Sequence, residues 1–310
     1  DPAMSTTATR AHGTHATPAT PPAERPRVDF IGIGVQKSAT AWLFRCVAEH
    51  PEIGIGRVGG GTGANKEINF FNQNYEKGFG WYDRLFDPAR PHNFEFSTLY
   101  FHDRNVPERI RRYNPEARLL LSLRNPIDRA FSQHKHEIRR GRLPPDRHGF
   151  RLALAQNPSY VEQGLYATHL QRWLEFFPRD RIHVVLHEEI LERPAEVLAG
   201  IFEFVGVDPT FRPARTGERI NESITVRSAR IERGLRLASR WTHRALGPTL
   251  HRTLKATGLP GRIRERNRVA IEGAVVPPLT AADRAELLDL FRDEIARLGE
   301  ILGRDLSHWR

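Results

Sequence analysis

Short apolar runs alternate with helix-like patterns along most of the chain. Three runs rich in Ile, Val and Leu predict strands buried on both faces, at residues 28–35, 118–123 and 182–186, and residues 93–96 are a fourth candidate. Apolar residues spaced by three and four predict helices at 39–50, 107–113, 126–141, 160–177, 194–205 and 280–302. Strands that alternate with helices build βαβ units, so the pattern predicts an α/β fold, a single domain with a central, mostly parallel sheet flanked by helices.

Glycine-rich and low-complexity segments mark the limits of that domain. Residues 54–63 are rich in Gly and predict a mobile loop. Residues 1–27 are rich in Ala, Thr and Pro without apolar periodicity, which predicts a disordered tail, and the three residues before Met4 resemble a cloning remnant. We therefore expect the folded domain to span residues 28–310.

Charge is distributed unevenly over the 310 residues. The chain has 47 basic and 37 acidic side chains and a formal net charge of +10, but residues 211–268 hold fourteen Arg, one Lys and four Glu. Positive charge of this kind could attract nucleic acid, an anionic membrane or a phosphorylated small molecule. Because the rest of the chain is close to neutral, we expect residues 211–268 to form a basic lid or acceptor-side segment, and we expect no nucleic-acid partner.

Other features of the composition narrow the class of protein. Cys46 is the single Cys, which excludes an internal disulfide and a Cys-based zinc site. Arg supplies 42 of the 47 basic residues, a skew that is typical of GC-rich bacterial genomes. The chain as given has no signal-peptide core and no run of about 18 apolar residues, which predicts a cytoplasmic protein that does not span a membrane.

The strongest chemical signal lies between the first predicted strand and the first predicted helix. Residues 34–41 read GVQKSATA, a glycine-containing turn that leads into a helix N-terminus. Backbone N–H groups there form an anion cradle, to which Lys37 adds a charge and Ser38 and Thr40 add hydroxyl donors. A Walker A loop would need Gly where Gln36 stands. The segment predicts a P-loop-like nucleotide site, and a plain turn with an exposed Lys37 is the alternative.

Five segments, in matching order and spacing, resemble sulfotransferases that use 3′-phosphoadenosine 5′-phosphosulfate (PAPS). The similarity is greatest to the branch that includes heparan-sulfate sulfotransferases and their bacterial relatives, and it covers roughly residues 30–309. The resemblance implies metal-free, in-line transfer of a sulfuryl group from PAPS to a hydroxyl, or less often an amine, of a small-molecule, saccharide or glycolipid acceptor. The matching segments are residues 36–41, 66–71, 121–132, 164–167 and 302–307.

The resemblance also implies the residues of the site. Glu67 would take the proton of the acceptor, Lys37 would stabilise charge on the leaving oxygen, and His136 would support the sulfuryl group. Arg124 ends a buried strand, where a parallel sheet presents its ligands, and its guanidinium can bind the 3′-phosphate with two hydrogen bonds. Ser132, about two helical turns further on, can add a hydroxyl donor. The expected nucleotide-binding residues are Gln36, Lys37, Ser38, Ala39, Thr40, Ala41, Arg124, Ser132, Tyr166 and Arg219.

Several of these residues have simpler alternatives. Arg124 could pair with Asp128 at the start of a helix. Glu67 could be a surface charge beside Lys66, and His136 could be a solvated helix residue.

Two positions depart from the family pattern, and one pair of histidines could suggest a metal site. The family usually has Gly at the position of Ala39. Ala can replace this Gly if φ at the residue is negative. The family usually has a second Thr at the position of Ala41, so Ala41 removes one hydroxyl from the 5′-phosphate site. His134 and His136 are two residues apart, so a helix points their rings in different directions, and we expect no metal.

The acceptor side of the site is left open by the sequence. Animal members of the family have a Lys- and Gly-rich loop that closes on the nucleotide, and no such loop is visible here. The amphipathic basic stretch 228–257 could cover an acceptor cleft, make peripheral contact with an anionic membrane or form a solvated helix. Possible substitutes for the closing loop are Arg215, Arg219 and Arg227.

Two other classes of function compete with sulfuryl transfer. A P-loop kinase of small molecules would need Mg²⁺, a true Walker A loop and an Asp near the end of a second strand, where this chain has Arg124. A non-enzymatic polyanion-binding protein would use the basic segment 211–268, but readers of single-stranded nucleic acid interleave aromatic side chains with basic ones. That segment offers only Phe211 and Trp241. The sequence does not indicate an oligomeric state.

Overall fold

The computed structural model describes residues 27–57, 66–140, 142–143, 145–218, 224–226, 268–270 and 276–309. Three predictions fall wholly or mainly outside the described residues. They concern the disordered tail, the basic segment 211–268 with its stretch 228–257, and the nucleotide contact of Arg219.

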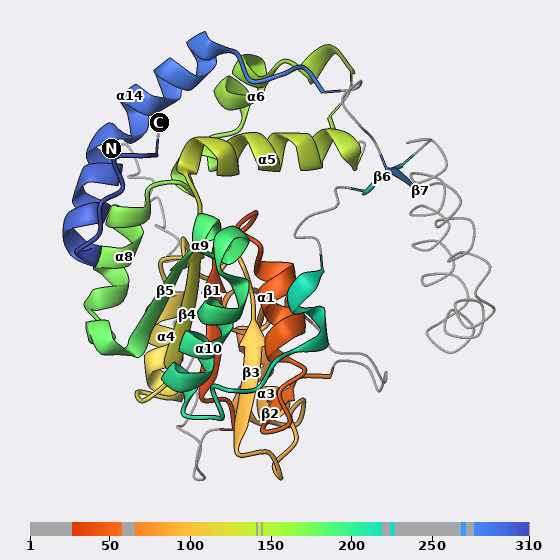
Figure 1. Cartoon of the computed structure of the whole chain (residues 1–310), viewed down its shortest axis with the longest axis vertical. Helices are drawn as coiled ribbons and strands as arrows, with labels where there is room; N and C mark the ends of the chain where they lie inside the picture. The colour runs from red at the N-terminus through yellow and green to blue at the C-terminus, as the bar shows by residue number, and fades with distance from the viewer. Residues whose placement is uncertain are drawn as a thin grey trace, which may run out of the picture.

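A five-stranded, all-parallel sheet forms the centre of the described structure (Figure 1). Its strands are β1 (Phe30–Gly34), β2 (Ile53–Ile55), β3 (His92–Phe96), β4 (Arg118–Leu123) and β5 (Ile182–Leu186). They lie in the order β2-β3-β1-β4-β5, and each neighbouring pair is parallel. The carboxyl ends of all five strands therefore meet at one edge. The predicted α/β fold is confirmed, with a sheet that is parallel throughout.

Strand side chains alternate between two hydrophobic cores. In β4, Leu119 and Leu121 join one core while Leu120 joins the other, as the two-residue period of a strand requires. The first core packs against α4 (Val106–Tyr113), α5 (Pro126–Arg139), α8 (Tyr166–Leu174) and α14 (Ala281–Leu302). The second packs against α1 (Thr40–Val47), α9 (His187–Glu192) and α10 (Pro194–Val205).

Short elements complete the described structure. A separate antiparallel pair joins β6 (Ile224–Val226) and β7 (Arg268–Ala270). The short helices are α2 (Phe70–Gln73), α3 (Phe79–Asp83), α6 (Phe150–Gln156) and α7 (Ser159–Glu162), with 3₁₀ turns η1 (Tyr75–Lys77), η2 (Pro145–Arg147), η3 (Arg179–Arg181) and η4 (Ala214–Gly217).

Two long helices begin with the caps that their sequences favour. Asn125 Oδ1 accepts a hydrogen bond from the Ile127 N–H at 2.9 Å at the start of α5. Thr280 Oγ1 accepts one from the Asp283 N–H at 3.0 Å at the start of α14. These bonds satisfy N–H groups that have no partner within the helix. Among the described residues, none of the helices combines the length and the apolar character needed to cross a bilayer.

Two sequence predictions of local structure are wrong, and one helix was not predicted. The helix predicted over 160–177 is two helices, α7 and α8, because the turn at Gly164 packs closely on its neighbours. A Cβ at Gly164 would lie 2.7 Å from the Phe291 ring of α14. The stretch 54–63, predicted as a loop, begins within edge strand β2. Helix α9 follows β5 without a connecting loop and was not predicted.

Candidate active site

The predicted phosphate loop follows β1 and is fixed to the end of the neighbouring strand β4. The Val35 N–H donates to the Ser122 carbonyl at 2.8 Å, and Ser122 Oγ donates to the Ser38 carbonyl at 2.6 Å. Arg124 Nη1 donates to the Lys37 carbonyl at 3.4 Å. Loop residues 35–39 therefore lie against the strand end that carries Arg124.

The loop backbone takes a left-handed conformation at two residues. φ is 75° at Lys37 and 59° at Ala39, so the negative φ that would make Ala easy to accommodate in place of Gly is not found. An L-residue pays about 1–2 kcal/mol for this conformation, which Gly adopts freely. Tertiary contacts of the loop with β4 impose it here. Left-handed residues at a strand–helix junction turn backbone N–H groups toward one point, a geometry that suits anions.

A buried hydroxyl in the loop has no partner among the described residues. Ser38 is 0% exposed, and its Oγ makes no hydrogen bond in the described part of the chain. Buried polar groups are normally satisfied. Thr40 is buried and Gln36 half-buried, whereas Ala41 is exposed on the first turn of α1.

Positive charges crowd around the loop. The pKa of Lys37 is lowered to about 8. Burial is the main cause, and the charges of Arg140, Arg139 and Arg124 add to it. Burial also lowers the pKa of Arg124 and of Lys135. These phosphate-site cations (Lys37, Arg124, Lys135, Arg139 and Arg140) repel one another, so an anion among them would be stabilised.

Arg124 makes no ion pair with a carboxylate within the described residues. The alternative pairing with Asp128 is not found, because Asp128 Oδ1 pairs with Arg284 Nη2 at 2.6 Å. Tyr166 is almost fully buried, and its Oη donates to the Arg124 carbonyl at 2.9 Å. In this structure Tyr166 therefore supports the backbone of Arg124.

Glu67 lies at the same edge, next to the end of β3. Its N–H donates to the Phe96 carbonyl at 2.9 Å, and its φ is 66°. Glu67 Oε2 accepts the Thr98 N–H at 2.9 Å and Oε1 accepts the Thr98 hydroxyl at 2.9 Å. Lys66 Nζ also bonds to Oε1, and 34% of the Glu67 side chain remains exposed. The carboxylate is thus held by Thr98, paired with Lys66 as the simpler alternative expects, and still partly open to solvent.

Helix α5 extends from β4 past the loop. The pKa of His136 is lowered to about 3, first by burial and then by the charge of Lys37, so the ring is neutral at pH 7. Ser132, one turn before it, is half-buried. The neighbouring His134 is buried and its Nε2 bonds to the His148 carbonyl at 2.9 Å. Within the described ranges, no group of three or more His, Cys, Asp or Glu residues could hold a metal ion.

Sequence reasoning missed His187, which follows β5 at the same edge. His187 is 8% exposed, and its Nε2 has no hydrogen-bond partner among the residues described. Burial lowers its pKa to about 4, and the charge of Arg124 contributes. Its position in the sequence could have identified it, because His187 is a polar residue directly after a buried parallel strand.

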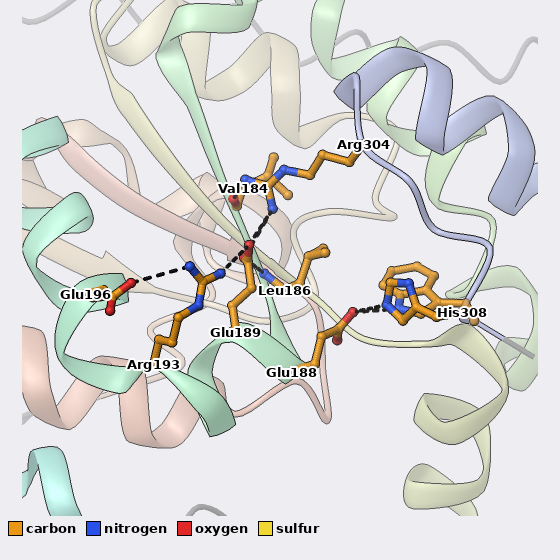
Figure 2. Close-up of polar contacts among 9 residues, drawn as sticks. Val184, Leu186, Glu188, Glu189, Arg193, Glu196, Arg304 and His308 are labelled. Carbon is orange, nitrogen blue, oxygen red and sulfur yellow. Dashed lines mark hydrogen bonds and ion pairs between the residues drawn. The ribbon is translucent and has the colours of Figure 1, made fainter.

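The C-terminal segment docks on the first turn of α9 (Figure 2). Glu188 Oε1 accepts hydrogen bonds from His308 Nε2 at 2.8 Å and from Trp309 Nε1 at 2.7 Å. Arg304 Nη1 pairs with Glu189 Oε2 at 3.1 Å. We call this set of contacts the C-terminal clasp. The Trp309 ring also packs 6.2 Å from the Tyr166 ring, behind Arg124.

Comparisons with known proteins agree with this geometry. A family profile described as "Sulfotransferase domain" matches residues 27–233. The fold is similar to that of a sulfotransferase crystal structure from Alicyclobacillus acidocaldarius, with a TM-score of 0.65 and 25% identity. That similarity covers 92% of this chain and 99% of the other.

Curated relatives are longer proteins. The chain is 28% identical to bifunctional heparan sulfate N-deacetylase/N-sulfotransferase 2 of Bos taurus, over 90% of this chain and 30% of the relative. It is 30% identical to heparan sulfate glucosamine 3-O-sulfotransferase 5 of Homo sapiens, over 58% of this chain and 53% of the relative. The chain thus spans less than a third of the first relative and about half of the second.

Proposed function

The chain belongs to the sulfotransferase family, and we propose on this basis that it transfers a sulfuryl group from PAPS to an acceptor hydroxyl without a metal. The observation that carries the proposal is the meeting of three features at one sheet edge. The phosphate loop follows β1, Arg124 follows β4, and Glu67 bonds to the extension of β3. The positive charges of Lys37 and Arg124 therefore lie at the same sheet edge as the partly exposed carboxylate of Glu67.

The chemistry of these side chains fits a donor with two phosphate positions. Ser38 Oγ and the loop N–H groups offer donors for the 5′-phosphosulfate, and Lys37 offers a charge. Arg124 and Ser132 offer donors for the 3′-phosphate. His187, whose buried Nε2 has no hydrogen-bond partner in the described part of the chain, is a further candidate contact for the nucleotide.

The reaction that we propose needs one base and one cation from the protein. PAPS supplies the activated sulfuryl group. Glu67 takes the proton of the acceptor hydroxyl while the acceptor oxygen forms its bond to sulfur. Lys37 neutralises charge on the phosphate oxygen whose bond to sulfur breaks. The neutral His136 ring can donate a hydrogen bond without adding charge.

The names of the relatives support one class of acceptor over the others. The names of both curated relatives include heparan sulfate, a saccharide. We therefore propose a saccharide hydroxyl as the first acceptor to test, with small molecules and glycolipids next. A saccharide amine is tested beside it, because the name of the Bos taurus relative includes N-sulfotransferase.

Nucleotide binding and transfer distinguish this proposal from its competitors. We expect calorimetry to detect tight binding of 3′-phosphoadenosine 5′-phosphate (PAP) without metal, and mass spectrometry to detect acceptors that gain one SO₃ group from PAPS. Preference for ATP with Mg²⁺ and phosphorylated products would indicate a kinase. Heparin binding without any nucleotide binding would indicate a polyanion-binding protein.

The substitution Arg124→Ala tests the 3′-phosphate contact. We expect it to weaken PAP binding by about 2–5 kcal/mol, because a partly buried charge pair is lost. AMP, which lacks the 3′-phosphate, should bind almost as before. Arg124→Lys is the matched control, since it keeps the charge and loses the two-pronged geometry. Equal losses for PAP and AMP would mean that Arg124 supports the fold and does not read the phosphate.

A further inference from the structure

A fully buried carboxylate lies behind Glu67, in the strand that ends beside it. Glu95 of β3 is 0% exposed and accepts hydrogen bonds from three hydroxyl groups. Ser97 Oγ and Tyr100 Oη both donate to Glu95 Oε1, each at 2.6 Å. We call Glu95, Ser97 and Tyr100 together the Glu95 hub. Tyr82 Oη donates to the other oxygen, Oε2.

The two hydroxyls of the hub also bond to the backbone at the start of α2. The Asn69 N–H donates to Ser97 Oγ at 2.9 Å, and the Phe71 N–H donates to Tyr100 Oη at 3.2 Å. A backbone N–H can only donate, so each hydroxyl must accept here and direct its own hydrogen to Glu95. Glu95 Oε1 is therefore an acceptor for both, and it fixes the orientation of both hydroxyls.

The backbone that depends on these bonds carries Glu67. Glu67 and Asn69 both have a left-handed φ, 66° and 52°. The first N–H groups of a helix have no partner within it, and a buried N–H without an acceptor is costly. Asn69 Nδ2 also donates to the Glu67 carbonyl at 3.0 Å. The alignment of residues 67–71 with the end of β3, which sets the bonds from Glu67 to Thr98, thus depends on the hub.

We propose that Glu95 is a positioning residue for Glu67, acting through the two hydroxyls that it orients. It holds residues 67–71 against the end of β3, so that the Glu67 carboxylate keeps its two bonds to Thr98. Only the assignment of Glu67 as the base rests on the proposed function. Burial raises the pKa of Glu95, and its three hydroxyl partners oppose that rise.

Two buried tyrosines provide a matched test. Tyr100→Phe removes a bond to Glu95 and also leaves the Phe71 N–H without its acceptor. We expect a rate of single-turnover sulfation about 10- to 100-fold lower, faster hydrogen exchange over residues 69–71 and unchanged PAP affinity. Tyr82→Phe removes a bond to Glu95 but no bond to that backbone. It should leave both the rate and the exchange close to wild type.

Variants of Glu95 itself complete the test. Glu95→Gln keeps a carbonyl oxygen for the two hydroxyls and should retain most of the rate, whereas Glu95→Leu should resemble Tyr100→Phe. Equal rate losses in the two tyrosine variants, or unchanged exchange in Tyr100→Phe, would overturn the proposal even if Glu95→Leu fails to fold. Exchange and PAP binding need no turnover. If the wild type transfers no sulfuryl group, the proposed function fails while the exchange data still decide the role of the hub.

Discussion

Replacing Glu67 by Gln should lower the rate of sulfation at saturating donor and acceptor by about 10²–10⁴, the usual contribution of a positioned base. Gln has nearly the same shape as Glu and keeps one oxygen, which can still accept the Thr98 N–H, but its amide cannot take the proton of the acceptor hydroxyl. PAP affinity should hardly change, because the phosphate-site cations and the loop are untouched. The paired measurement is the single-turnover rate and the dissociation constant for PAP.

Glu76 offers a matched control for this substitution. It lies nine residues further along the chain, in η1, and is exposed. Glu76→Gln removes the same charge from the same region and should leave the rate unchanged. If Glu67→Gln keeps more than about a tenth of the wild-type rate while chemistry limits that rate, Glu67 is not the base.

Replacing Lys37 by Ala should lower the rate by about 10²–10³, the typical cost of losing one preorganised donor to a developing charge. The charge of Lys37 matters most when negative charge builds on the leaving oxygen. PAP affinity should fall less, because Ser38 and the loop N–H groups still meet the 5′-phosphate. Loss of affinity with a preserved saturated rate would make Lys37 a binding residue only.

The lowered pKa of Lys37 adds a dependence on pH. In the free protein this pKa is about 8, so the ammonium loses its charge as the pH rises through that value. PAP affinity should therefore weaken above about pH 8, and Lys37→Ala should remove that change. Lys77→Ala is the control, because Lys77 is exposed and stacks on Trp81 at 4.3 Å. A Lys37→Ala profile that matches the wild type would exclude the side chain as the titrating group.

The parallel core was predictable because its strands are apolar on both faces. Residues 118–123 and 182–186 were predicted with the bounds that the structure has, since each holds four Leu, Ile or Val residues within five or six positions between two helices. Strand β2 was missed because an edge strand of three residues with a central Gly carries almost no periodic signal. The break at Gly164 depends on the Phe291 ring, more than a hundred residues away in sequence, and local propensity cannot reveal it.

The candidate site was partly predictable for the same reason. Lys37 and Arg124 follow buried strands, and adjacent parallel strands bring such residues together. The left-handed conformation of Ala39 could not be read from the sequence, because contacts with β4 override the local preference of Ala. The Glu95 hub could not be foreseen, because a Glu between two Phe residues looks like one polar position of an edge strand. Ser97 and Tyr100 are close to Glu95 in sequence, but the backbone N–H groups that they accept, those of Asn69 and Phe71, come from a separate segment that only the fold brings near.

The C-terminal clasp has a consequence for how the protein is made. Glu188 and His308 are separated by 120 positions in the chain, and Trp309 packs on Tyr166, whose hydroxyl donates to the Arg124 carbonyl. Closing so long a loop costs entropy that local contacts do not repay. A nascent chain can therefore form the sheet before residues 304–309 have left the ribosome, but the contacts of the clasp form only after those residues emerge. Folding of the core and maturation of the site are thus separated in time during synthesis.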